Sequence, residues 1–208
     1  MRRDAPATLR NRAPILDVLR RHVRPGDRVL EIASGSGQHA VYLAPRLGVT
    51  WQPTDMDPDA RASIDAWRAH EPRDPGGADA GSLAGDLGGT VLPARALDVT
   101  EAWNVGSTDV LVCINMVHIS PWAATVALLA GAARLGPRVV YLYGPYKRGG
   151  RHTAPSNEAF EGWLKAQSPD YGVRDLEAVV AEAARSGLVV TEIVEMPANN
   201  LSLVLGRA

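Results

Sequence analysis

The sequence contains one cysteine, one phenylalanine, no long apolar run and a net charge of only −1. Because Cys113 has no partner for an internal disulfide, we expect a reducing compartment and predict a cytoplasmic location. No stretch approaches the roughly 18 apolar residues that a membrane-spanning helix needs, so no membrane partner is expected. The 22 basic and 23 acidic residues create no overall attraction for nucleic acid, which disfavours a nucleic-acid substrate.

The remaining composition, 46% hydrophobic and 22% charged, is that of a folded globular chain. We expect one domain over residues 1–208, which is long enough to bury a sizeable core. Residues 1–27 are expected to form an N-terminal helical segment, and residues 71–90, rich in Gly, Pro and Asp, a mobile loop. No Cys or His cluster has the spacing of a zinc site, so no metal is predicted. The sequence leaves the oligomeric state open, with a homodimer among the alternatives.

Short apolar runs alternate with segments of helical periodicity, which predicts an α/β fold with a mostly parallel sheet. The last two runs are joined by a short turn, which indicates a final strand antiparallel to the others. The expected strands cover residues 28–33, 48–55, 91–99, 108–119, 137–146, 188–197 and 200–208. The expected helices cover residues 13–23, 37–47, 58–70, 122–135, 156–167 and 174–187.

The turn after the first strand, "VLEIASGSGQHA" at residues 29–40, fits two cofactor patterns. Gly35, Gly37 and Ala40 spell the dinucleotide pattern G-x-G-x-x-A, whereas residues 31–37 spell E-x-A-x-G-x-G, which is typical of S-adenosylmethionine binders. The glycines alone do not choose between the two. Glu31 does discriminate, because a carboxylate just before the turn repels a pyrophosphate and attracts an ammonium and a sulfonium. The sequence therefore favours the methyl donor over a nicotinamide dinucleotide.

Two further acids lie at the carboxyl ends of predicted strands, where open α/β sheets bind their ligands. Asp55 lies 20 residues after Gly35, a position from which a carboxylate can accept hydrogen bonds from ribose hydroxyls in either cofactor. Asp98 in "ALDVT" can accept from the exocyclic amine of adenine. Both residues therefore support an adenosine ligand.

With these residues placed, the chain resembles the class I S-adenosylmethionine-dependent methyltransferases over nearly its whole length. More narrowly, it resembles a poorly characterised methyltransferase-like family, a domain of unknown function, found in bacteria and animals. The stretches that carry this resemblance are "NRAPIL", "VLEIASGSGQHAVYLA", "WQPTDMDP", "ALDVT", "CINMVHISPW", "LYGPYKRGGRHTAPSN", "RDLE" and "EMPANNLSLV".

The resemblance implies a Rossmann-like methyltransferase domain whose seven-stranded sheet has the order 3-2-1-4-5-7-6. Ala33 stands where many methyltransferases have the first glycine of the turn, and it is compatible with the motif if its φ is negative. The residues expected to bind the donor are Glu31, Ala33, Ser34, Gly35, Gly37, Asp55, Met56, Asp98, Val99 and Asn115.

For the acceptor we expect a small molecule, methylated at a hydroxyl or phenol oxygen or at nitrogen. Asn115 and His118 lie at the end of predicted strand four, where the class places residues near the transferable methyl, and are the predicted catalytic pair. A neutral imidazole can accept a phenol proton, although a backbone-bonding role for His118 is equally compatible with the sequence. The residues predicted to bind the acceptor are Tyr143, Tyr146, Arg151, His152, Asn157 and Asn199.

Two other functions remain open on the sequence alone. One is a binding protein that keeps the S-adenosylmethionine pocket without transferring the methyl group. The other, less favoured by Glu31, is a nicotinamide-dependent oxidoreductase.

Overall fold

The structure, a computed structural model, describes residues 1–70 and 87–208. The loop predicted at residues 71–90 lies mostly outside the described residues. The described chain divides into two compact units. The first ends at Leu97, and the second begins at Asp98. Within the described ranges, no helix is both long and apolar enough to cross a bilayer.

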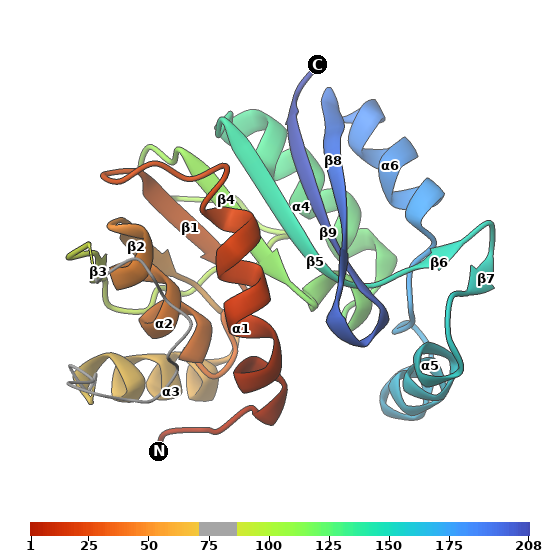
Figure 1. Cartoon of the computed structure of the whole chain (residues 1–208), viewed down its shortest axis with the longest axis horizontal. Coiled ribbons are helices and arrows are strands. Elements are labelled where there is room, and N and C mark those ends of the chain that lie inside the picture. Colours follow the sequence, from red (N-terminus) through yellow and green to blue (C-terminus); the bar gives the residue numbers. More distant parts are fainter. Residues whose placement is uncertain (71–86) are drawn as a thin grey trace. The chain divides into compact units, whose positions relative to one another are not determined.

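The first unit places parallel strands beside helices, as the alternation of its sequence predicts (Figure 1). β1 pairs in parallel with β2, so that Glu31 lies opposite Pro53, and β2 pairs in parallel with β3. The elements are α1 (Pro6–Leu19), β1 (Arg28–Ile32), α2 (Gln38–Leu47), β2 (Thr50–Pro53), α3 (Pro58–Ala69) and β3 (Thr90–Val91).

Two boundaries in this unit differ from the sequence prediction. The first helix was predicted at residues 13–23 but begins at Pro6, and Pro14 lies inside it. Pro6 fits a first helical position because its missing N–H would be unpaired there anyway. The strand predicted at residues 91–99 is only the two-residue β3, followed by an isolated bridge between Thr54 and Arg95. Pro93 cannot donate to a sheet ladder, which accounts for the break.

The second unit has two apolar strands followed by a long antiparallel pair. All residues of β4 and β5 are buried, as the continuous apolar runs predict. β9 runs antiparallel to both β5 and β8, which confirms the predicted final strand. The elements are β4 (Val110–Ile114), η1 (Met116–His118), α4 (Trp122–Leu135), β5 (Val139–Pro145), β6 (Lys147–Arg148), β7 (Arg151–His152), α5 (Pro155–Gln167), α6 (Leu176–Arg185), β8 (Leu188–Met196), η2 (Pro197–Asn199) and β9 (Asn200–Arg207).

The short hairpin of β6 and β7 is absent from the sequence prediction. Its turn residues Gly149 and Gly150 both have positive φ, 56° and 74°. This is the backbone of a tight two-residue hairpin, which glycine adopts at little cost. The loop after β5 is therefore an ordered hairpin that Figure 1 shows leading into α5.

The seven main strands form one sheet in the order β3-β2-β1-β4-β5-β9-β8. Once the small hairpin is set aside, this is the predicted order 3-2-1-4-5-7-6. The Rossmann-like α/β fold is thereby confirmed.

Candidate functional site

The glycine-rich turn of the first unit is tied to the end of β2 by one carboxylate. Asp55 accepts the backbone N–H of Gly35 on one oxygen, at 3.0 Å, and that of Asp57 on the other, at 2.9 Å. Ser34 donates its own N–H to the carbonyl of Thr54. Because each Asp55 oxygen uses one lone pair for these contacts, each keeps another for a ligand hydroxyl.

The backbone of this turn differs from the prediction at one position. Ala33 has φ of +55°, not the negative φ on which its compatibility with the motif rested. A left-handed conformation is costly for a residue with a Cβ, so Ala33 is strained here. Gly37 also has positive φ, and a Cβ on it would lie 2.6 Å from the Cα of Ile64. Glycine at this position therefore permits the close approach of α2 to α3.

Glu31 lies at the carboxyl end of β1 and is 1% exposed. The indole N–H of Trp51 donates to its carboxylate at 2.9 Å. Burial raises the pKa of Glu31 to about 7, although the hydrogen bonds from Trp51 and Ser34 oppose the shift and the nearby Asp55 charge adds to it. The site thus holds a carboxyl group that is close to half ionised at neutral pH. A cationic ligand would favour its ionised form.

The N-terminal segment contacts the same turn, which the sequence did not reveal. The N–H of Ala5 donates to the side chain of Gln38 at 2.6 Å, directly after the glycine turn. Arg3 donates its N–H to Ser63, whose hydroxyl in turn donates to the carbonyl of Ser36. No motif in residues 1–5 signals these contacts, because they depend on the tertiary approach of α1 to α2.

The other predicted donor residues are placed as follows. Met56 is exposed beside Asp55 at the end of β2. Asp98 is half-buried in the second unit, and its carboxylate accepts both the N–H and the O–H of Thr100. These hydrogen bonds lower the pKa of Asp98, so this carboxylate is ionised at neutral pH. Val99 follows it, and its carbonyl accepts the indole N–H of Trp103.

His118 lies in η1 and is 0% exposed. Its Nδ1 accepts the backbone N–H of Arg174 at 3.2 Å, and its carbonyl accepts the N–H of Gly172. Burial and the Arg174 charge lower the pKa of His118 to about 3, so the ring is neutral at pH 7. A neutral ring whose Nδ1 accepts must carry its proton on Nε2.

These contacts leave His118 without a lone pair for a substrate proton. Its Nε2 has no hydrogen-bond partner among the described residues, and the ring meets Tyr146 edge-on with centroids 4.8 Å apart. The predicted base role stays untested, but the geometry favours the backbone-bonding alternative. Asn115 precedes η1 with φ of +65°, a conformation that asparagine tolerates well, and stays a predicted site residue.

Two of the predicted acceptor residues meet in one network. Asn157 donates its amide to the carbonyl of Asn199 at 3.0 Å and to the hydroxyl of Thr153 at 3.1 Å. The Asn199 amide donates to Ser156. The turn before β9 is therefore joined to the start of α5. Of the others, Tyr143 and Tyr146 are buried, and Arg151 is exposed on the hairpin.

His152 belongs to an ion-pair cluster that the sequence did not predict. Its Nε2 lies 2.6 Å from Oε2 of Glu161, and the Lys147 ammonium donates to the same carboxylate at 2.8 Å. The hydrogen bonds and charges of these partners hold the pKa of Glu161 below its usual value, against the opposing effect of partial burial. The Nδ1 of His152 is buried and has no hydrogen-bond partner among the described residues.

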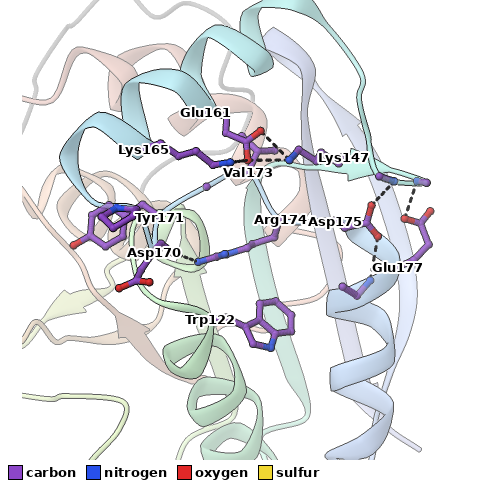
Figure 2. A pocket seen from close by; sticks show the side chains of 15 residues that line it. Trp122, Lys147, Glu161, Lys165, Asp170, Tyr171, Val173, Arg174, Asp175 and Glu177 are labelled. Atoms are coloured by element: carbon purple, nitrogen blue, oxygen red, sulfur yellow. Dashed lines mark hydrogen bonds and ion pairs between the residues drawn. The ribbon is translucent and has the colours of Figure 1, made fainter.

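A pocket of about 690 Å³ opens beside this cluster, within the second unit (Figure 2). Arg174 lines this pocket and donates hydrogen bonds to the carbonyls of Val117, Ser120 and Asp170. These hydrogen bonds fasten the segment before α6 to η1. The pocket walls include Trp122, Lys147, Glu161, Lys165 and Tyr171. Within the described residues, no group of three or more His, Cys, Asp or Glu side chains is arranged to hold a metal ion.

One family model matches this chain, and solved structures of other proteins share its fold. A family model described as "Protein of unknown function (DUF938)" matches residues 2–207. The pyocyanin biosynthetic protein PhzM is 18% identical, with 97% of this chain and 56% of that chain covered and a TM-score of 0.69. The mitomycin 7-O-methyltransferase MmcR is 13% identical, with 97% and 54% covered and a TM-score of 0.76.

A third structure is closer in length. Magnesium protoporphyrin IX methyltransferase from Synechocystis PCC 6803 is 14% identical, with 95% of this chain and 82% of that chain covered and a TM-score of 0.66. The chain spans only about half the length of the first two structures. At these identities the likeness establishes the fold.

Proposed function

The chain belongs to the family described as protein of unknown function (DUF938), and we propose that it is an S-adenosylmethionine-dependent methyltransferase for a small-molecule acceptor. The observation that carries this proposal is the buried Glu31 at the carboxyl end of β1, directly before the glycine turn. A pyrophosphate bound at that turn would face a partly ionised carboxylate in a poorly solvated site. The ammonium and sulfonium of the methyl donor would instead be stabilised by it.

The residues around Glu31 fit an adenosine-containing donor. Asp55 keeps lone pairs for ribose hydroxyls while it holds Gly35 in place. A Cβ on Gly35 would meet nothing within 4 Å, so the outer face of the turn is open to a ligand. The neighbouring structures named for methyl transfer support the same reading. We assign donor contacts in the first unit to Glu31, the turn at residues 33–37, Asp55 and Met56. Asp98, Val99 and Asn115 remain predicted donor residues of the second unit.

The second unit supplies the groups that we assign to binding of the methyl acceptor. The network of Asn157 and Asn199 and the hairpin carrying His152 offer amide, hydroxyl and imidazole groups for a polar small molecule. Methyl transfer from a sulfonium is an in-line displacement, so the main task of these groups is to orient the nucleophile. Attack by a hydroxyl or phenol oxygen additionally requires that a proton be removed.

The test is transfer of an isotopically labelled methyl group. The purified chain is incubated with methyl-labelled S-adenosylmethionine and a small-metabolite extract, and products are identified by mass spectrometry. We expect a labelled small molecule whose formation depends on the protein and is greatly reduced in Glu31→Gln. Donor binding without any labelled product would support a binding protein instead. Binding of NADH with no binding of S-adenosylmethionine would refute the donor assignment.

A further inference from the structure

Two histidines of the second unit could remove a proton from an acceptor, and their surroundings differ in one decisive respect. His118 uses Nδ1 to accept a backbone N–H and is 0% exposed. His152 instead has its Nε2 beside the Glu161 carboxylate, 2.6 Å from Oε2, and its Nδ1 accepts no hydrogen bond from the described residues. A carboxylate accepts only, so it selects the tautomer in which Nε2 carries the proton. In that tautomer Nδ1 of His152 has a lone pair.

The cluster around Glu161 is built to hold this arrangement. The Glu161 carboxylate lies 2.8 Å from the Lys147 ammonium and 2.6 Å from Nε2 of His152. The Lys165 ammonium lies 3.7 Å from the same carboxylate. The Glu161 side chain is only 12% exposed, so these contacts are poorly screened by water. The carboxylate therefore orients the imidazole and stabilises the positive charge that it gains on accepting a proton.

Nδ1 of His152 is a buried polar atom without a hydrogen-bond partner among the described residues. A buried polar atom without a hydrogen bond lowers the stability of the folded protein, unless a ligand or a water molecule forms a hydrogen bond with it. Thr153, the next residue, accepts from Asn157, so His152 adjoins the Asn157 and Asn199 network. A ligand hydroxyl that donated a hydrogen bond to Nδ1 would supply the missing partner.

We propose that His152 is the general base of the proposed methyl transfer and that Glu161 is its positioning residue. This inference rests on the proposed function. The hydroxyl proton of the acceptor passes to Nδ1 as the oxygen electron pair forms a bond to the methyl carbon of the donor. The carbon–sulfur bond breaks with its electron pair going to sulfur, which leaves a methyl ether, S-adenosylhomocysteine and an imidazolium paired with Glu161. The imidazolium then returns its proton to solvent.

The first test reads the ring nitrogens and needs no acceptor. Long-range ¹⁵N–¹H NMR on the full chain with labelled histidine, assigned by the signals lost in His152→Asn, reports which nitrogen carries the proton. We expect the neutral ring of His152 to be protonated on Nε2 and bare on Nδ1 at pH 8. Protonation on Nδ1 would overturn the proposal, because that nitrogen could then accept nothing.

The second test separates the base from the donor site. With the acceptor identified by the labelling experiment, we expect His152→Asn to lower kcat by about 100-fold or more and to leave the Kd for S-adenosylmethionine within about twofold. His70→Asn, which changes an exposed histidine at the end of α3, should leave both values unchanged. An unchanged kcat in His152→Asn would refute the base role. Failure of the unmodified protein to bind the donor would instead refute the proposed function.

Glu161→Gln tests the positioning role through the pH profile. An amide still accepts the hydrogen bond from Nε2 but no longer stabilises the imidazolium. We therefore expect a lower kcat and a shift of the acidic limb of the kcat profile to lower pH, because the protonated ring is disfavoured. An acidic limb at the same pH as in the unmodified protein would contradict the role assigned to Glu161.

Discussion

Replacing Glu31 by glutamine should stabilise the ligand-free protein at neutral and alkaline pH. The pKa of Glu31 is raised from 4.5 to about 7 by burial. Between these two values the unfolded chain has lost this proton while the folded protein keeps it, so the folded state loses stability as pH rises. At about 1.4 kcal/mol per pKa unit, the full loss is about 3 kcal/mol above pH 7. Glutamine has no such penalty and can still accept the hydrogen bond from Trp51.

The quantity to measure is the difference in free energy of unfolding between Glu31→Gln and the unmodified protein, from urea unfolding at several pH values. We expect this difference to move by about 3 kcal/mol in favour of the variant between pH 4.5 and pH 8. A constant offset from altered hydrogen bonding would cancel in this comparison. A difference that does not change with pH would show that Glu31 is not held partly protonated by burial.

Three glycine and alanine substitutions test the backbone and packing. Ala33→Gly should raise the free energy of unfolding by about 1 kcal/mol because it relieves the left-handed backbone at φ of +55°, and an equal or lower melting temperature would count against the strain. Gly144→Ala would place a Cβ 2.4 Å from Nε2 of His118, so chemical unfolding should show a loss of about 1–3 kcal/mol. Gly162→Ala is the matched control, because a Cβ there meets nothing within 4 Å, and it should stabilise exposed helix α5 by about 1 kcal/mol. Destabilisation of equal size in both variants would contradict the contact between Gly144 and His118.

The sheet could be predicted because each strand leaves a local signal in the sequence. β4 and β5 are continuous apolar runs, and they are buried along their whole length. The third strand was overestimated since apolar residues continue past Pro93 although the ladder does not. The N-terminal helix begins earlier than the predicted residue 13, because Pro6 occupies its first turn and Pro14 is accommodated inside it.

The candidate site was predictable where it follows strand ends and unpredictable where it depends on tertiary contacts. Glu31, Gly35 and Asp55 are recognised by their spacing, and the structure joins Gly35 to Asp55 directly. The sign of φ at Ala33 is set by the geometry of the turn, not by the residue type. No spacing rule connects His152 to Glu161, nine residues apart across a hairpin and the start of a helix. The burial and tautomer of His118 likewise depend on Arg174, which is 56 residues distant.

The most direct test of the central claim is a calorimetric titration of S-adenosylmethionine at pH 7 in two buffers of different ionisation enthalpy, with Glu31→Gln as the reference. A carboxyl group with a pKa of about 7 that binds a cation must release about half a proton at this pH. The account predicts that the unmodified protein binds the donor and releases about half a proton more than the variant does. No binding of the donor, or the same proton release in both proteins, would contradict it.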